Sequence, residues 1–332
     1  MPKTIKKHIK RKVSRRKKRK SNTLVSLMMV VGIIVFGYLY INGYIDLSLW
    51  IPEEQQPNYS AAQNEEGYYF YQWVEPSDYY YTANHLTGLA LFQSLNQIIN
   101  EGYIAPRYED AKTVLSQADR SLDNPTKVVN IYTGLLVDAT WDSTSWHREH
   151  VWPNSRLGIP RVSDSSRNQG SDLHNLRAIT PSVNSSRGDR YFNEGSGSNH
   201  TTPNGGYYPG DDHRGDVARI LFYMATMYDF LTLTDDDLED TSNHYTPEGA
   251  MMGKLSLLLL WHREDPVDDF ERQRNQVIYE FQGNRNPFID QPAYVHLIWE
   301  EMEIEDLTET EVLIHIEIVL FTMERKRGVF DV

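Results

Sequence analysis

The chain has 332 residues, of which 40% are hydrophobic and 12% aromatic, enough to build one large globular domain. This composition argues against a disordered or fibrous protein. Charge is unevenly placed: Lys and Arg supply 12 of the first 20 residues, whereas no Asp or Glu precedes Asp46. Because the sequence has no cysteine, a disulfide framework, a thiolate metal site and a cysteine nucleophile are excluded. Any metal must use oxygen or imidazole ligands.

An apolar segment follows the basic head. Residues 24–41 contain no charge, and this length just spans a bilayer as a helix. The positive-inside rule keeps the basic head in the cytoplasm and sends the body outside. A cleaved signal peptide has the same order, but no small-x-small cleavage site follows the apolar run. We therefore predict a cytoplasmic tail over 1–20 and an uncleaved membrane anchor over 21–45, with a secreted protein as the alternative.

The next segments are predicted in chain order. Residues 46–67 are rich in Pro, Gln, Asn and Glu and indicate a linker, and a folded domain is expected over 68–300. Apolar residues at helical spacing predict helices over 85–99 and 108–115. An apolar run predicts a strand over 128–136.

The middle of the domain reads as strand, loop, strand and helix. We expect a strand over 145–152 that Pro153 stops, a polar loop over 156–171, and a returning strand over 175–179. Thr180 followed by Pro181 is a cap and first-turn signal for a helix.

The remainder is predicted as helices around an irregular loop. Gly, Ser, Asn and Pro make residues 195–215 a loop, and helices are expected over 217–231, 251–261 and 270–281. The domain is thus α+β, mixed and helix-rich. Residues 301–332 form a C-terminal extension with no predicted role, whose apolar part is too short and too charged to span a membrane.

The residues from 146 to 192 carry the chemistry. Cleaving a phosphodiester needs a base for water, a cation for the developing charge, and donors that hold the phosphate. His150 can accept a proton near neutral pH, and Glu149 and Asn184 offer the hard oxygen ligands that Mg²⁺ prefers. Seven arginines and four acids lie between residues 148 and 190, which favours a polyanionic ligand.

Two geometric points bear on this site. Neighbours on a regular strand face opposite sides, so the strand must twist or end at Glu149 and His150. On the following helix, Asn184 and Arg187 share a face, which lets Arg187 flank a phosphate at the metal and act in catalysis. The arginines expected to bind nucleic acid are Arg148, Arg156, Arg167 and Arg187.

Four blocks in this order resemble the endonuclease I family, bacterial periplasmic and secreted nucleases built on the ββα-metal (His-Me finger) motif. They are REHVWPNSRLG, DLHNLRAITPSVNSSRGDRYF, RGDVARILFYM and QGNRNPFIDQP, and the resemblance covers roughly residues 85–294. It implies His150 as general base and Glu149 and Asn184 as ligands of Mg²⁺, with Mn²⁺ or Ca²⁺ as possible substitutes. It also implies 5′-phosphate products and cleavage of DNA, and often RNA, without sequence preference.

In some relatives a loop arginine stabilises the transition state. This role stays open here between Arg156, Arg161 and Arg167, because the loop aligns poorly. Structural roles are expected for other polar residues of the blocks, with hydrogen bonds from Asp172, His174 and Asn175 holding the hairpin. Packing and turn roles are expected for Arg219 and for residues 284–288.

Three functions are compared. The complete motif favours a nuclease acting on DNA and RNA, attached to the membrane through its N-terminal helix and without an implied protein partner. A catalytically silent surface protein that captures nucleic acid is the alternative, and intact Glu149, His150 and Asn184 argue against it. A phosphodiesterase for small nucleotides is the third, although an open, arginine-rich loop suits a polymer better.

Overall fold

A computed structural model of the chain describes residues 59–235 and 250–308. Within these ranges the fold is mixed and helix-rich, with small two-stranded sheets. The helices are α2 (Gly88–Asn100), α3 (Ala111–Ala118), α4 (Pro181–Arg187), α5 (Arg214–Met227), α6 (Leu255–Glu264), α7 (Asp269–Gln282), α8 (Pro287–Asp290) and α9 (Ala293–Trp299). The strands are β1 (Lys127–Val129), β2 (Leu136–Asp138), β3 (His147–His150), β4 (Leu176–Ile179), β5 (His200–Thr201), β6 (Tyr207–Tyr208), β7 (Thr232–Leu233) and β8 (Met251–Met252).

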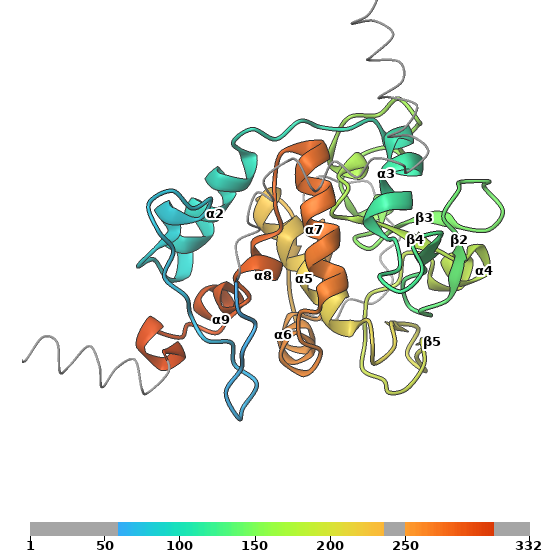
Figure 1. Cartoon of the computed structure of the whole chain (residues 1–332). Coiled ribbons are helices and arrows are strands. Elements are labelled where there is room, and N and C mark those ends of the chain that lie inside the picture. Colours follow the sequence, from blue (N-terminus) through green and yellow to red (C-terminus); the bar gives the residue numbers. More distant parts are fainter. Residues whose placement is uncertain (1–58, 236–249, 309–332) are drawn as a thin grey trace, which may run out of the picture. The chain divides into compact units, whose positions relative to one another are not determined.

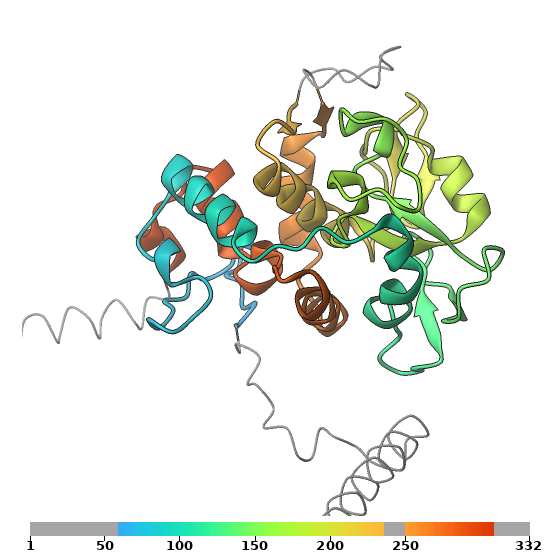
Figure 2. The ribbon, with the colours of Figure 1, turned by 90° about the horizontal axis from the view of Figure 1, so that it is seen from above.

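Helix α5 forms the centre of the domain. Helices α2 and α9 lie on one side of it, and the β3–β4 hairpin with α4 lies on the other, as Figures 1 and 2 both show. Every residue of α5 from Gly215 to Met227 is buried. The helix predicted over 217–231 is therefore confirmed in kind, but it begins at Arg214 and is enclosed on all sides, as core helices are.

The predicted strand, loop, strand and helix of the middle segment are present. Strand β3 pairs antiparallel with β4, with Glu149 opposite Arg177 and His150 opposite Leu176. Helix α4 begins directly afterwards with Pro181 in its first turn. Thr180 occupies the N-cap position, but its side chain makes no capping hydrogen bond, so the fixed φ of proline is the local signal that starts this helix.

The prediction of a single strand over 128–136 is wrong in the middle of this range. Instead of one strand, the chain forms the β1–β2 hairpin, in which Val128 pairs with Val137. Tyr132 and Gly134 have φ angles of 72° and 65° in the turn. Positive φ is incompatible with a continuing strand, and glycine adopts it without steric cost. Asn130 and Gly134 were the available turn signals in this run, but most of its other residues favour strands.

Other boundaries also differ from the predictions. The loop expected over 195–215 contains the short antiparallel pair β5–β6. The helix expected over 251–261 is preceded by strand β8, and α6 begins at Leu255. These strands have two residues each, too few for an alternating pattern to be visible in the sequence.

Segments predicted as linker and extension pack on the domain where the structure describes them. The Gln63 side chain donates to the Arg263 carbonyl at 2.9 Å, so ordered packing begins before the boundary expected at residue 68. At the other end, Leu307 is buried and its carbonyl accepts a hydrogen bond from the Tyr71 amide at 2.8 Å. The apolar part of the extension beyond residue 308 lies outside the described residues.

No helix within residues 59–235 and 250–308 is long and apolar enough to cross a membrane. The predicted tail over 1–20 and anchor over 21–45 lie outside these ranges, so the anchor stays a prediction.

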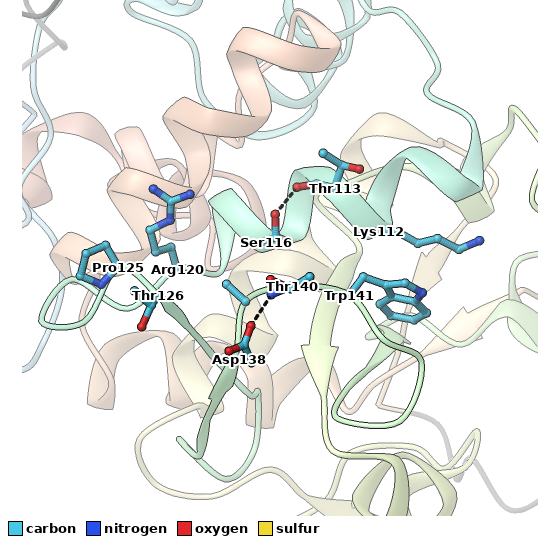
Figure 3. A pocket seen from close by; sticks show the side chains of 10 residues that line it. Lys112, Thr113, Ser116, Arg120, Pro125, Thr126, Asp138, Thr140 and Trp141 are labelled. Atoms are coloured by element: carbon cyan, nitrogen blue, oxygen red, sulfur yellow. Dashed lines mark hydrogen bonds between the residues drawn. The ribbon is translucent and has the colours of Figure 1, made fainter. Parts of the chain in front are cut away.

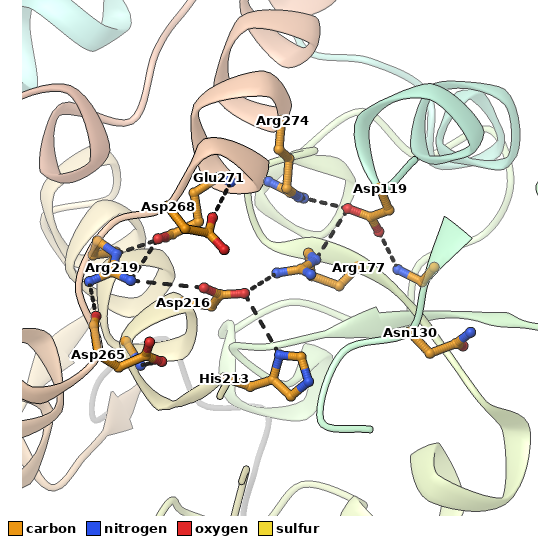
Figure 4. A network of polar contacts seen from close by, with 12 residues as sticks. Asp119, Asn130, Arg177, His213, Asp216, Arg219, Asp265, Asp268, Glu271 and Arg274 are labelled. Atoms are coloured by element: carbon orange, nitrogen blue, oxygen red, sulfur yellow. Dashed lines mark hydrogen bonds and ion pairs between the residues drawn. The ribbon is translucent and has the colours of Figure 1, made fainter. Parts of the chain in front are cut away.

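A buried ionic network fixes the hairpin to the helices (Figure 4). Arg177 of β4 forms ion pairs with Asp119 at 3.2 Å and Asp216 at 3.1 Å. Asp119 also pairs with Arg274 of α7 at 2.9 Å and accepts a hydrogen bond from the Ala178 amide. Strand β4, the end of α3, α5 and α7 are therefore joined through charged groups that are removed from water.

Arg219, for which a packing role was expected, belongs to the same network. Its guanidinium donates two hydrogen bonds to the carboxylate of Glu271, at 2.7 and 2.6 Å. Both side chains are buried. A two-point contact of this kind between guanidinium and carboxylate fixes orientation as well as distance, so it aligns α5 with α7.

Asp119→Ala should lower the free energy of unfolding by about 3–5 kcal/mol, because it leaves Arg177 and Arg274 buried without their shared carboxylate. Urea denaturation of the full chain measures this. Asp138→Ala is the matched control, since among the described residues the ion pair of Asp138 is with Lys127, at 3.9 Å and on the surface. Equal losses in the two variants would show that the network does not stabilise the fold.

Candidate active site

Strand β3 presents Glu149 and His150 to different surroundings. Arg148 and His150 both stack on Tyr108, with the Arg148 guanidinium carbon 3.6 Å and the His150 ring centre 5.3 Å from the centre of the Tyr108 ring. Glu149 instead contacts Tyr132 and Arg187. The alternation of a regular strand is thus kept through Glu149, and the strand ends at His150 as expected.

Glu149 is a buried carboxylate whose negative charge is only partly balanced by its neighbours. Its Oε1 accepts a hydrogen bond from the Tyr132 hydroxyl at 2.9 Å and lies 3.4 Å from Nε of Arg187. Burial raises the pKa of Glu149 to about 7, against the opposing effects of the Arg187 charge and the Tyr132 hydrogen bond. Its other oxygen, Oε2, makes no hydrogen bond with the described residues. A further positive charge beside Oε2 would therefore stabilise the ionised form.

His150 is held as a neutral imidazole with a defined tautomer. Its Nε2 lies 2.7 Å from the Gly170 carbonyl, which can only accept, so Nε2 carries the proton. Burial and, in smaller part, the charges of Arg148, Arg187 and Arg161 together lower the pKa of His150 to about 4, against the raising effect of the Gly170 hydrogen bond. Nδ1 has no hydrogen bond with the described residues and is free to accept a proton.

Gly170 has a role that the sequence reading missed. A Cβ atom at this position would lie 2.5 Å from Cγ1 of Val162, so only glycine allows this close approach. The carbonyl of Gly170 is the group that accepts the His150 hydrogen bond. A glycine within a polar loop was the available signal, but loops contain many glycines and spacing alone does not single this one out.

Asn184 lies on α4, which packs against β3. Its side chain makes no hydrogen bond with the described residues, so the carboxamide oxygen is available to a ligand. Within the described ranges no group of three or more His, Asp and Glu side chains gathers around a common centre. One carboxylate and one carboxamide, completed by water, fit Mg²⁺, which commonly keeps several of its water ligands.

Arg187 is placed differently from the expectation. It is fully buried, and its Nη2 donates to the Val151 carbonyl at 2.7 Å. Its guanidinium also stacks over Phe192, 4.8 Å from the ring centre. These contacts make Arg187 a neighbour that orients Glu149. A direct contact between Arg187 and a phosphate stays a prediction, which its burial does not favour.

The other predicted nucleic-acid-binding arginines fall into two groups. Arg148 bonds to Asp164 and to the Tyr108 carbonyl, and Arg156 is buried with its Nε donating to the Asp189 carbonyl at 2.7 Å. Arg167 is exposed, although its Nη1 donates to the Ala105 carbonyl at 2.7 Å. Arginines that look equivalent in the sequence therefore differ in how readily they can reach a substrate.

Arg161 is exposed. Its positive charge is the last of the causes that lower the pKa of His150, after burial and the charges of Arg148 and Arg187. Among the three loop arginines left open by the sequence, Arg161 thus combines exposure with an electrostatic effect on the histidine.

Asp172, His174 and Asn175 all make structural contacts, but of the three only Asn175 holds the hairpin as predicted, whereas Asp172 and His174 attach this segment to α5 and to residues 282–284. The Asn175 side chain accepts from the Trp152 amide at 2.7 Å and donates to the Trp152 carbonyl at 3.0 Å, which ties the two strands together beyond β3. Asp172 is buried and accepts hydrogen bonds from the hydroxyls of Tyr223 and Tyr228. His174 is also buried, against the Asn284 carbonyl. In the segment 284–288, Asn286 caps α8.

A strand ending in Glu-His, an antiparallel partner strand and a helix that presents an asparagine define the ββα class of nuclease site. The chain belongs to the endonuclease I family, whose family model matches residues 87–293. This range agrees with the extent of the sequence resemblance.

Relatives in the family include secreted bacterial enzymes. The chain is 38% identical over 240 residues to an extracellular ribonuclease of Bacillus subtilis (strain 168), covering 68% of this chain and 80% of the relative. It is 39% identical over 238 residues to an extracellular ribonuclease of Bacillus amyloliquefaciens, covering 68% and 79%. An extracellular deoxyribonuclease of Aeromonas hydrophila is 27% identical over 160 residues, covering 43% and 60%.

Proposed function

We propose that this protein is a metal-dependent endonuclease that hydrolyses phosphodiester bonds of DNA and RNA without sequence preference and leaves 5′-phosphate ends. The observation that carries the proposal is the neutral His150, with Nδ1 free, next to Glu149 on the same strand. Family relatives are named for ribonuclease and for deoxyribonuclease activity, which supports both substrates.

In the proposed reaction, His150 acts as general base through Nδ1. It takes a proton from water while the water oxygen forms a bond to phosphorus and the bond to the 3′ oxygen breaks, and the 3′ oxygen leaves as an alkoxide that takes a proton from solvent water. The Gly170 carbonyl keeps the proton on Nε2, so Nδ1 remains the accepting atom throughout. Glu149 and Asn184 hold Mg²⁺, which when bound supplies positive charge for the phosphate and the leaving oxygen. Mn²⁺ or Ca²⁺ can substitute at these ligands.

Around this centre, protein groups restrict the geometry. Tyr132 and Arg187 fix the orientation of the Glu149 carboxylate, and Tyr108 stacks on the His150 ring. Arg161 is the loop arginine proposed to stabilise the transition state, because it is exposed and its charge acts on His150. Arg148, Arg156, Arg167 and Arg187 were predicted to bind nucleic acid. Of these, Arg167 is exposed and suits phosphate contacts, whereas the others act through neighbouring groups.

The full chain should cut plasmid DNA and single-stranded RNA when Mg²⁺ is present, and EDTA should abolish both activities. Mapped cut sites on a DNA fragment should be scattered, because no base-reading element is evident near the site and phosphate contacts carry no sequence information. A single consensus sequence would contradict the proposal. Binding of nucleic acid without any cleavage would instead favour the silent surface protein.

Substitutions should separate the roles of base and ligand. His150→Ala removes the base but neither metal ligand, so cleavage should fall by roughly 10²–10⁴-fold while Mg²⁺ still binds. Asn184→Ala should lower activity by weakening Mg²⁺ binding, with partial recovery at high metal concentration. The measurement is cleavage rate against Mg²⁺ concentration, with circular dichroism to confirm folding. Near-parent activity of His150→Ala would refute its assignment.

The loop arginine is tested in the same assay. Arg161→Gln should lower kcat with little change in KM, since a contact made only in the transition state affects the chemical step. Arg167→Gln is the comparison variant, because it removes the same charge from the same loop. Since Arg167 is assigned to phosphate contacts, this variant should raise KM and leave kcat near the parent value. If Arg167→Gln lowers kcat and Arg161→Gln does not, the transition-state role belongs to Arg167.

We further propose that the chain is anchored by residues 21–45 with the nuclease domain outside. The charge pattern of the head and apolar segment supports this topology, and the extracellular relatives agree with a domain outside the cell. Protease added to intact cells should release a fragment of the size of the body. Protection of the body until cells are lysed would contradict the topology, and recovery of the protein from the medium would indicate a cleaved segment.

A further inference from the structure

A groove of about 710 Å³ lies outside the residues assigned to catalysis (Figure 3). It is bounded by α3, by the β1–β2 hairpin and by the segment that follows β2. This volume falls in the range of pockets that take a small organic ligand, and is therefore large enough for a nucleotide.

The side chains along the groove are those that bind single-stranded nucleic acid. Lys112 and Arg120 supply positive charge, and the half-buried Trp141 supplies an aromatic ring (Figure 3). Hydroxyl groups of Thr113, Ser116, Thr126 and Thr140 line the space between them. Cationic grooves with aromatic platforms bind single strands because phosphates meet the charges and bases stack on the rings.

The two cations stand at opposite ends of the groove, Arg120 beside Pro125 and Lys112 beyond Trp141 (Figure 3). The Arg120 guanidinium pairs with no carboxylate among the described residues. Lys112 lies 2.6 Å from Asp164, but Asp164 is half exposed, and exposed ion pairs are weak enough to exchange for a phosphate. One acid, Asp138, also lines the groove, and its contact with Lys127 is long, at 3.9 Å, and exposed. The lining residues thus carry two positive charges and one negative charge, a small positive excess within an acidic protein.

A short chain of contacts connects the groove to the catalytic histidine. Trp141 lies 5.5 Å from the guanidinium of Arg148, which stacks on Tyr108 at 3.6 Å. Tyr108 in turn stacks on His150. Trp141 also packs edge-on against the buried Trp146, which directly precedes β3. The indole is thus held in place by the same segment that carries the catalytic residues.

We infer that this groove binds a single-stranded segment of the substrate that extends from the scissile phosphate. One base stacks on Trp141, and phosphates contact Lys112 and Arg120. Stacking needs a base with a free face, so the groove favours single strands over duplexes. This inference rests on the proposed nuclease function and adds a preference for strand form and length to it.

Binding tests the groove without requiring cleavage. Fluorescence anisotropy of a labelled oligothymidylate in EDTA should show about tenfold weaker binding for Trp141→Ala in the full chain, while Trp141→Phe keeps most of the affinity. A duplex of equal length should be affected much less. Trp73→Ala is the control, because Trp73 is 46% exposed and does not line the groove.

Arg120 is tested through salt dependence. If its guanidinium contacts a phosphate, Arg120→Gln should reduce the slope of log affinity against log salt by roughly 0.7 for single strands. Arg263→Gln removes the same charge away from the groove and should leave the slope unchanged. A purely structural role of Arg120 would change the affinity without changing this slope, so the Arg120 variant remains informative if Trp141→Ala fails to fold.

Kinetics distinguishes failure of the groove from failure of the nuclease proposal. For long single strands, Trp141→Ala should raise KM about tenfold and leave kcat unchanged, while cleavage of a dinucleotide stays at the parent rate. If the parent protein cuts nucleic acid and the groove variants bind and cut every substrate as the parent does, the groove inference is wrong. The proposed nuclease function is then unaffected. If the parent binds single strands through Trp141 but cuts nothing with Mg²⁺, the nuclease proposal fails and the groove stands.

Discussion

The ion pairs of Arg177 with Asp119 and Asp216 are the interactions on which the arrangement of the site depends. Arg177 lies on β4 directly opposite Glu149 of β3, so whatever fixes β4 also fixes the proposed metal ligand. A buried guanidinium is costly unless its charge is met, and the carboxylates that meet it come from the end of α3 and from α5. The hairpin is therefore attached to the helical core through its charges as well as through apolar packing.

Because the hairpin is fixed, its two faces can hold Glu149 and His150 in different surroundings. Glu149 faces Tyr132 and Arg187, whereas His150 faces Tyr108 and the Gly170 carbonyl. Each group is thereby oriented by its own neighbours, and a change at one face need not disturb the other. Because neighbours on a strand face opposite sides, the base His150 and the proposed ligand Glu149 were not expected to lie together. This alternation instead separates Glu149, which must be charged to bind a metal, from His150, which must stay neutral.

The sequence predicted the order of strand, loop, strand and helix because Pro153 and Pro181 act locally and motif residues mark the ends of the strands. It did not predict the β1–β2 turn, since Tyr132 has a positive φ there, which tyrosine rarely adopts. Nor could it separate the arginines of the loop. Whether a guanidinium is buried depends on partners far along the chain, as Asp189 is for Arg156, and no local spacing records them.

The burial of several of these arginines weakens the argument that their number favours a polyanionic substrate. Counting seven arginines between residues 148 and 190 overstates the charge that a phosphate meets, because Arg156, Arg177 and Arg187 are buried and bonded within the protein. Residues 46–332 contain all 46 acids but 21 of the 33 lysines and arginines, so the net charge of this part of the chain repels nucleic acid. Attraction must then be local, from the exposed Arg161 and Arg167 of the loop and from Lys112 and Arg120 of the groove.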